Sequence, residues 1–135
     1  MNSKPQISKE IFWVALGGMA GALLRDGTNQ LLPHAADGTV LLTATFIENI
    51  IGSFLIGLIF FLLKGRVVKN RFLSLFLLTG LIGSYTTYSG FMVEAFFYSK
   101  ESVTMMLLYL FSQIFTGVLA VFAGGYVAKS FTSKK

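Results

Sequence analysis

Four long apolar segments dominate this chain, and each is long enough to cross a membrane. They run over residues 11–32, 44–63, 72–98 and 103–127. The hydrocarbon core of a bilayer is about 30 Å thick, and a helix of roughly 20 apolar residues spans it. The sequence therefore predicts an all-α, polytopic membrane protein, with four transmembrane helices in a single domain over residues 1–135.

The composition argues against the functions of water-soluble proteins. Hydrophobic residues make up 54% of the 135 residues and charged residues only 13%, about half the charged share of a soluble domain. The chain has no cysteine and one histidine, which excludes a thiolate nucleophile, a disulfide and a histidine metal cluster. The sequence displays no nucleophile–base pair or cofactor loop, and we do not expect an enzyme.

The third segment is unusual at its centre. Residues 80–91 contain three glycines and a run of hydroxyl side chains, a poor composition for a continuous helix facing lipid. Non-helical backbone is tolerated at membrane depth only inside protein or beside a wet cavity. We therefore predict a third helix that is broken at its centre, with backbone groups freed for ions. The alternative is an unbroken packing helix rich in small residues.

Lysine and arginine are concentrated on one predicted side of the membrane. With four spans, the N-terminus, the second connection and the C-terminus share a side. Nine of the eleven basic residues fall there: Lys4, Lys9, Lys64, Arg66, Lys69, Arg71, Lys129, Lys134 and Lys135. Arg25 and Lys100 fall on the other side. The positive-inside rule predicts both termini in the cytoplasm, so the net charge of +5 indicates membrane topology rather than nucleic-acid binding.

Polar residues inside membrane spans are costly and are candidates for function. In the second span, Asn49 shares a helical face with Gly52, Ser53 and Ile56, and its amide group can donate hydrogen bonds. The alternative role for Asn49 is a hydrogen bond between helices, worth about 0.6 kcal/mol on average.

The third and fourth spans add aromatic and polar candidates. Tyr88 and Phe91 are three residues apart, so their rings share a face if the helix resumes after the break. The positive ring edges are weak anion partners, although ordinary packing explains the same pattern. Glu94 is either a hydrogen-bond partner within the bundle or a proton carrier. A polar stripe follows on the fourth span: Tyr109, Ser112, Gln113 and Thr116.

Three motifs together resemble one known family. Residues 17–25 (GGMAGALLR), 45–54 (TFIENIIGSF) and 80–91 (GLIGSYTTYSGF), the last followed by Glu94, are similar in order and spacing to the Fluc/CrcB family of small four-helix fluoride channels. The resemblance covers nearly the whole chain. It implies an antiparallel dimer with two fluoride pathways along the subunit interface, and a structural sodium ion held by backbone carbonyls of both broken third helices.

The resemblance also assigns roles by position. The sodium carbonyls would belong to Gly83 and Thr86, and Arg25 would lie near a vestibule. Asn49 would donate to fluoride, and Tyr88 and Phe91 would occupy the two phenylalanine-box positions. The expected fluoride pathway is therefore formed by Asn49, Thr87, Tyr88, Phe91 and Tyr109. Fluoride is small and strongly hydrated, so such a path must replace water with convergent N–H, O–H and ring-edge donors.

Several positions depart from the family pattern. Ala44, Tyr88 and Gly90 replace a glycine, a phenylalanine and a threonine. Glu48 stands where a small apolar residue is expected, and Gln113 where serine or asparagine is usual. A carboxylate about 4 Å from an anion costs on the order of 4 kcal/mol at an effective dielectric near 20. Glu48 and Gln113 are therefore predicted to alter a pathway.

The biased charge sets the expected assembly. A homodimer of opposed subunits needs one sequence to insert in both directions, which a nine-to-two distribution of basic residues disfavours. We therefore predict a subunit of a heterodimeric channel, with an oppositely oriented homologous partner. It would export fluoride across the cell (inner or plasma) membrane and so relieve fluoride toxicity.

Two other functions stay open at this point. One is a proton-coupled small membrane exporter that uses Glu48 or Glu94. The other is a non-transporting membrane assembly subunit, in which every polar residue only holds the bundle together. A small multidrug exporter would need a carboxylate deep in the first helix, where this chain has only Glu10 at the entrance.

Overall fold

All regular elements of the described residues are helices. The computed structural model describes residues 4–32, 42–64 and 70–132. Their elements are α1 (Lys4–Leu31), α2 (Ala44–Lys64), α3 (Arg71–Ser74), the π-helix η2 (Leu75–Ile82), α4 (Gly83–Tyr85), α5 (Tyr88–Glu101) and α6 (Val103–Thr132). The predicted all-α class is confirmed. The basic residues Arg66, Lys69, Lys134 and Lys135 lie outside the described residues.

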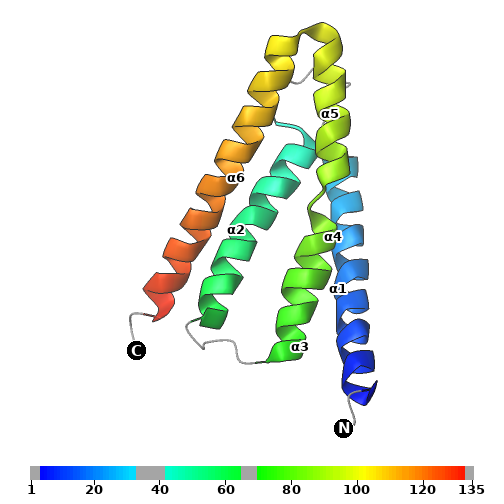
Figure 1. Cartoon of the computed structure of the whole chain (residues 1–135), viewed down its shortest axis with the longest axis vertical. Helices are drawn as coiled ribbons and strands as arrows, with labels where there is room; N and C mark the ends of the chain where they lie inside the picture. Colours follow the sequence, from blue (N-terminus) through cyan, green and yellow to red (C-terminus); the bar gives the residue numbers. More distant parts are fainter. Residues whose placement is uncertain (1–3, 33–41, 65–69, 133–135) are drawn as a thin grey trace.

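The helices run along the length of the molecule (Figure 1). Within the described part of the chain, three helices are long and apolar enough to cross a membrane: Gln6–Leu31, Ala44–Lys64 and Val103–Phe131. The shorter elements α3, η2, α4 and α5 follow one another end to end beside them (Figure 1). The start of α1 and the end of α6 lie at the same end of the molecule, and the corner between α5 and α6 lies at the other (Figure 1). Four complete crossings remain a prediction.

The third segment is broken, as the sequence predicts. Helix α4 ends at Tyr85 and α5 begins at Tyr88. Between them Thr86 (φ −76°, ψ 154°) and Thr87 (φ −142°, ψ 126°) are extended. The Thr87 hydroxyl accepts a hydrogen bond from the backbone N–H of Gly90 at 3.1 Å, and so caps the new helix. The alternative of an unbroken packing helix is therefore wrong.

Glycines allow the helices to approach closely in two places. Where α1 packs on η2, a Cβ atom on Gly21 would collide with the carbonyl oxygen of Leu81. Where α2 packs on α6, a Cβ atom on Gly57 would collide with the carbonyl oxygen of Val121. A Cβ atom on Gly17, Gly80 or Gly124 would likewise collide with a backbone carbonyl oxygen of the neighbouring helix. Such close backbone contacts provide dispersion energy in a membrane, where the hydrophobic effect does not drive helices together.

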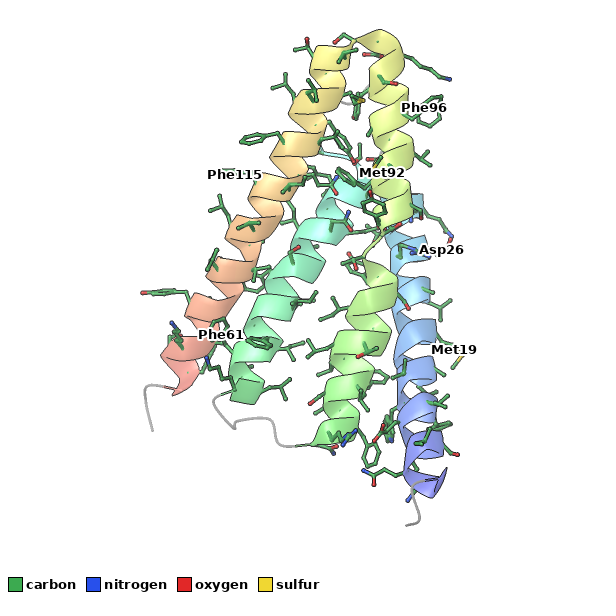
Figure 2. The ribbon with its side chains drawn as sticks, in the orientation of Figure 1. Met19, Asp26, Phe61, Met92, Phe96 and Phe115 are labelled. Atoms are coloured by element: carbon green, nitrogen blue, oxygen red, sulfur yellow. The ribbon has the colours of Figure 1, made fainter. Side chains whose placement is uncertain are left out.

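The outer surface of the bundle is strongly apolar. Met19, Phe96 and Phe115 point away from the neighbouring helices (Figure 2), and more than half of each side chain is exposed. An apolar surface of this extent suits lipid or a second subunit rather than water. Among the described residues, the long-range hydrogen bonds of polar side chains instead lie around the break, apart from the ion pair between Arg71 and Glu10 at 3.0 Å.

Candidate functional site

The break in the third segment is held by one side chain of α2. The backbone N–H of Thr87 donates to Asn49 Oδ1 at 2.9 Å, and Asn49 Nδ2 donates to the Thr87 carbonyl at 3.0 Å. Because a backbone N–H only donates, this contact fixes which end of the Asn49 amide is the oxygen. The amide nitrogen of Asn49 therefore has a defined direction.

A chain of hydrogen bonds continues from Asn49 across α6 to α5. Asn49 Nδ2 donates to Gln113 Oε1 at 2.6 Å, and Gln113 Nε2 donates to the Tyr109 hydroxyl at 2.7 Å. The Tyr109 hydroxyl in turn donates to Glu94 Oε2 at 2.5 Å. The same oxygen accepts from the Thr43 hydroxyl at 2.7 Å. This polar network joins three helices at the level of the break, and Gln113, Tyr109, Glu94 and Thr43 are all buried.

Aromatic rings line the same region. The Phe91 ring lies 5.6 Å from the Tyr109 ring, and the Tyr98 ring lies 4.8 Å from it on another side, both measured between centroids. Tyr88 follows at 6.1 Å from Phe91, but its side chain is 75% exposed. The two predicted box residues are therefore neighbours, one buried in the bundle and one at its surface.

An open groove of about 290 Å³ lies between α2 and α6 beside the polar network. Its polar lining comes from Asn49, Ser53 and Gln113. The rest of the lining is apolar: Phe91, Ile114, Gly117, Val118 and Val121. The side chains of Asn49, Ser53 and Gln113 carry donor groups of the kind that bind a small anion, and the edge of an aromatic ring such as Phe91 is a weak anion partner. Both N–H groups of Asn49 bond within the chain.

Glu48 lies apart from the network. Its side chain is fully buried (0% exposed), and neither carboxylate oxygen has a hydrogen-bond partner among the described residues. Glu48 and Arg25 do not line the groove. Arg25 instead lies half-buried on α1, where its carbonyl accepts from the Asn29 side chain at 2.9 Å.

The break removes the helical partners of two carbonyls. In a continuous helix the Gly83 carbonyl would accept from the N–H of Thr87 and the Thr86 carbonyl from the N–H of Gly90. Here Thr87 N–H donates to Asn49, and Gly90 N–H donates to the Thr87 hydroxyl. The carbonyl oxygens of Gly83 and Thr86 are thus the type of ligand that a hard cation such as sodium prefers. Groups of three or more metal-ligating His, Asp or Glu side chains are absent from the described ranges.

Two side chains near the network, Thr43 and Ser53, were not predicted as site residues, and two predicted polar residues do not contribute to it. Thr43 was missed, although a threonine directly before an apolar helix is a typical cap and its hydroxyl accepts from Phe46 N–H at 3.1 Å. The helical spacing predicts that Ser53 shares a face with Asn49, but Ser53 was not predicted as a site residue, although it lines the groove. Ser112 and Thr116 lie on the predicted stripe, yet their hydroxyls donate to backbone carbonyls of α6.

These features define a class: a small multi-pass helical membrane protein with a connected polar network beside one broken segment, an arrangement typical of channels and transporters. Residues 12–125 match the family described as CrcB-like protein, Camphor Resistance (CrcB). The chain belongs to this family.

Curated relatives are similar over most of their length. A protein named fluoride-specific ion channel FluC from Flavobacterium psychrophilum is 37% identical over 122 residues, which cover 90% of this chain and 98% of the relative. The protein of that name from Acidithiobacillus ferrooxidans is 36% identical, over 87% of this chain and 94% of the relative. Fluoride-specific ion channel FluC 1 from Carboxydothermus hydrogenoformans is 37% identical, over 90% and 95%.

Proposed function

We propose that this chain is a subunit of a fluoride-specific channel that exports fluoride across the cell membrane and so relieves fluoride toxicity. The observation that carries the proposal is the Asn49 amide, which is held at the break by Thr87 and lines a groove next to Phe91. The relatives' names point to the same ion.

The groove offers what a dehydrated anion needs. Fluoride loses water on entering a narrow path, and donors on the wall must replace the lost hydrogen bonds. Asn49 supplies N–H, and Phe91 supplies a ring edge beside Tyr109. Tyr88 and Thr87 would serve at the ends of this stretch. Arg25 would attract the anion from the aqueous side.

Fluoride efflux from liposomes tests the proposed function. The purified protein is reconstituted with potassium fluoride inside, and a fluoride electrode records release after a potassium ionophore is added. We expect release of fluoride but not of chloride. Absence of fluoride release, both for this chain alone and with each homologous chain from the same genome, contradicts the proposal.

We also propose that the channel is an antiparallel heterodimer in the inner or plasma membrane, with the termini of this chain in the cytoplasm. The bias of basic residues supports a single orientation. Since the chain has no cysteine, Ser8→Cys on α1 and Ser99→Cys on α5 can be labelled one at a time in intact cells. An impermeant maleimide should label only the Ser99→Cys variant. Equal labelling of both would indicate dual insertion and a homodimer.

A structural sodium ion is the proposed cofactor. The Gly83 and Thr86 carbonyls would hold it, together with the same carbonyls of a second subunit. Bound there, sodium would supply a positive charge that fixes two broken helices against each other. The diversion of the Thr87 and Gly90 N–H groups to Asn49 and the Thr87 hydroxyl supports this assignment.

One observation favours a second candidate function. Glu48 is buried without a hydrogen-bond partner among the described residues, and a carboxyl group held in that way is costly unless it has a role. A proton-coupled exporter would use such a group. Transport that depends on a proton gradient, is lost in Glu94→Gln and is insensitive to changes at Tyr88 and Phe91 would favour this alternative over the channel.

A further inference from the structure

Both N–H groups of the Asn49 side-chain amide are hydrogen-bonded within the chain. One N–H bonds to the Thr87 carbonyl at 3.0 Å and the other to Gln113 Oε1 at 2.6 Å. Asn49 and Thr87 form two hydrogen bonds with each other, because the Thr87 N–H also donates to Asn49 Oδ1 at 2.9 Å. The N–H that an anion can take without opening the break is therefore the one bonded to Gln113.

The direction of the Gln113 amide is fixed from both sides. At one side, Thr87 N–H orients Asn49, so that a donor faces Gln113. At the other side, the Tyr109 hydroxyl gives its proton to Glu94, so it can only accept from Gln113 Nε2. Gln113 must therefore present its oxygen to Asn49. A neutral acceptor of this same chain thus occupies the place that an anion would take on the Asn49 N–H.

Gln113 borders open space into which a different staggered rotamer could turn its side chain. Its side chain lines the groove of about 290 Å³, and a long unbranched side chain reaches several rotamers at low cost. When it leaves, the Asn49 N–H becomes available to a ligand in the groove. An arriving anion must then replace one neutral hydrogen bond.

We propose that Gln113 competes with fluoride for the Asn49 amide, and that this competition limits fluoride passage along the groove of this chain. The inference rests on the proposed function, and it identifies Gln113 as a residue that limits the rate of fluoride passage. A serine at this position is too short to reach Asn49, so a Gln113→Ser variant leaves the donor free. Glutamate keeps an acceptor of the same length and adds a charge that repels anions.

Fluoride efflux of matched variants is the first test. We expect Gln113→Ser to release fluoride about fivefold faster than the unchanged chain, the factor expected for removing a competing neutral hydrogen bond. Gln113→Glu should be slower than the unchanged chain. Gln30→Ser is the matched control, because Gln30 is exposed on α1 and bonds only to Asp26 among the described residues. It should leave the rate unchanged.

Side-chain NMR gives a second readout that does not depend on flux. The chain contains three glutamines, Gln6, Gln30 and Gln113, so ¹⁵N-glutamine labelling yields three side-chain amide signals. The signal that disappears in Gln113→Ser identifies Gln113. Sodium fluoride should shift this signal in a saturable manner, whereas sodium chloride should not, and neither salt should shift the signals of Gln6 and Gln30.

The outcomes separate the two proposals. If the unchanged chain conducts fluoride while Gln113→Ser is no faster and the Gln113 signal does not move, the competition by Gln113 is overturned and the channel function stands. If none of the proteins conducts fluoride and fluoride shifts no signal, the proposed function fails and the competition fails with it. Should Gln113→Ser not fold, the inference is still overturned if fluoride shifts none of the three glutamine side-chain amide signals of the unchanged, conducting protein.

Discussion

Asn49 holds the backbone of Thr87 at two points, accepting from its N–H at 2.9 Å and donating to its carbonyl at 3.0 Å. A side chain on α2 thus replaces the hydrogen bonds that a continued helix would have given to the third segment. The same contact removes the helical donor from the Gly83 carbonyl. The proposed anion donor and one proposed sodium ligand are therefore coupled through a single amide.

Asn49→Asp is expected to abolish fluoride efflux through the groove of this chain. The carboxylate still accepts from Thr87 N–H, but it faces the Thr87 carbonyl and Gln113 Oε1 without a proton to share. It also repels the anion. We expect a loss of stability of about 1–3 kcal/mol, measured by thermal unfolding in detergent, together with the efflux assay.

The matched control is Asn70→Asp. The Asn70 side-chain oxygen accepts from Phe72 N–H at 2.9 Å, a contact that aspartate keeps, and Asn70 does not line the groove. This variant should keep its fluoride efflux. Normal efflux in Asn49→Asp would show that Asn49 is not the anion donor.

Glu48→Val should stabilise the protein without slowing fluoride efflux. Removal of a fully buried carboxyl group that has no hydrogen-bond partner among the described residues relieves a desolvation cost of about 1–3 kcal/mol. Thermal unfolding should register this gain, whereas the same change at Glu101, which is exposed, should be near neutral. A folded Glu48→Val protein that no longer transports would place Glu48 in the transport mechanism and favour proton coupling.

The broken third segment could be predicted from composition, but its exact position could not. The composition of residues 80–91 predicts a break within this range without placing it, and two of the glycines, Gly80 and Gly83, lie within helical backbone. Gly80 serves close packing, because a Cβ atom there would lie 2.6 Å from the Val14 carbonyl oxygen. The extended residues are Thr86 and Thr87. Their conformation depends on Asn49, a long-range partner that local sequence does not reveal.

The hydrogen-bond partners within the polar network could not be predicted from the sequence either. Asn49 and Gln113 are 64 residues apart, and they meet because α2 packs on α6 at one register. Helical periodicity identifies which residues share a face but not which residue of the next helix stands opposite. Ser112 and Thr116 share a face with the network residues but do not join the network, because their hydroxyl groups bond to backbone carbonyls of their own helix.

Gly57→Ala tests the register of α2 on α6. The added methyl group would collide with the Val121 carbonyl oxygen, so the helices must separate, at a cost of about 1–3 kcal/mol. Gly27→Ala is the matched control, because a Cβ atom at Gly27 meets no heavy atom within 4 Å. Thermal unfolding should show a loss for Gly57→Ala and no loss for Gly27→Ala. Equal stability of the two variants would contradict the close contact of α2 with α6.

Thr86→Val separates backbone from side-chain ligation of sodium. The Thr86 hydroxyl donates to the Ile82 carbonyl at 3.0 Å, and valine keeps the methyl group that packs near Gly52. Sodium at the proposed site should raise the unfolding temperature relative to potassium. If only the Thr86 carbonyl binds sodium, the Thr86→Val variant should lose little stability and keep this expected increase. Gly52→Ala pushes a methyl group against the Thr86 side chain, which displaces the break and should reduce that increase. A sodium effect that disappears in Thr86→Val would instead assign the ligand to the Thr86 hydroxyl.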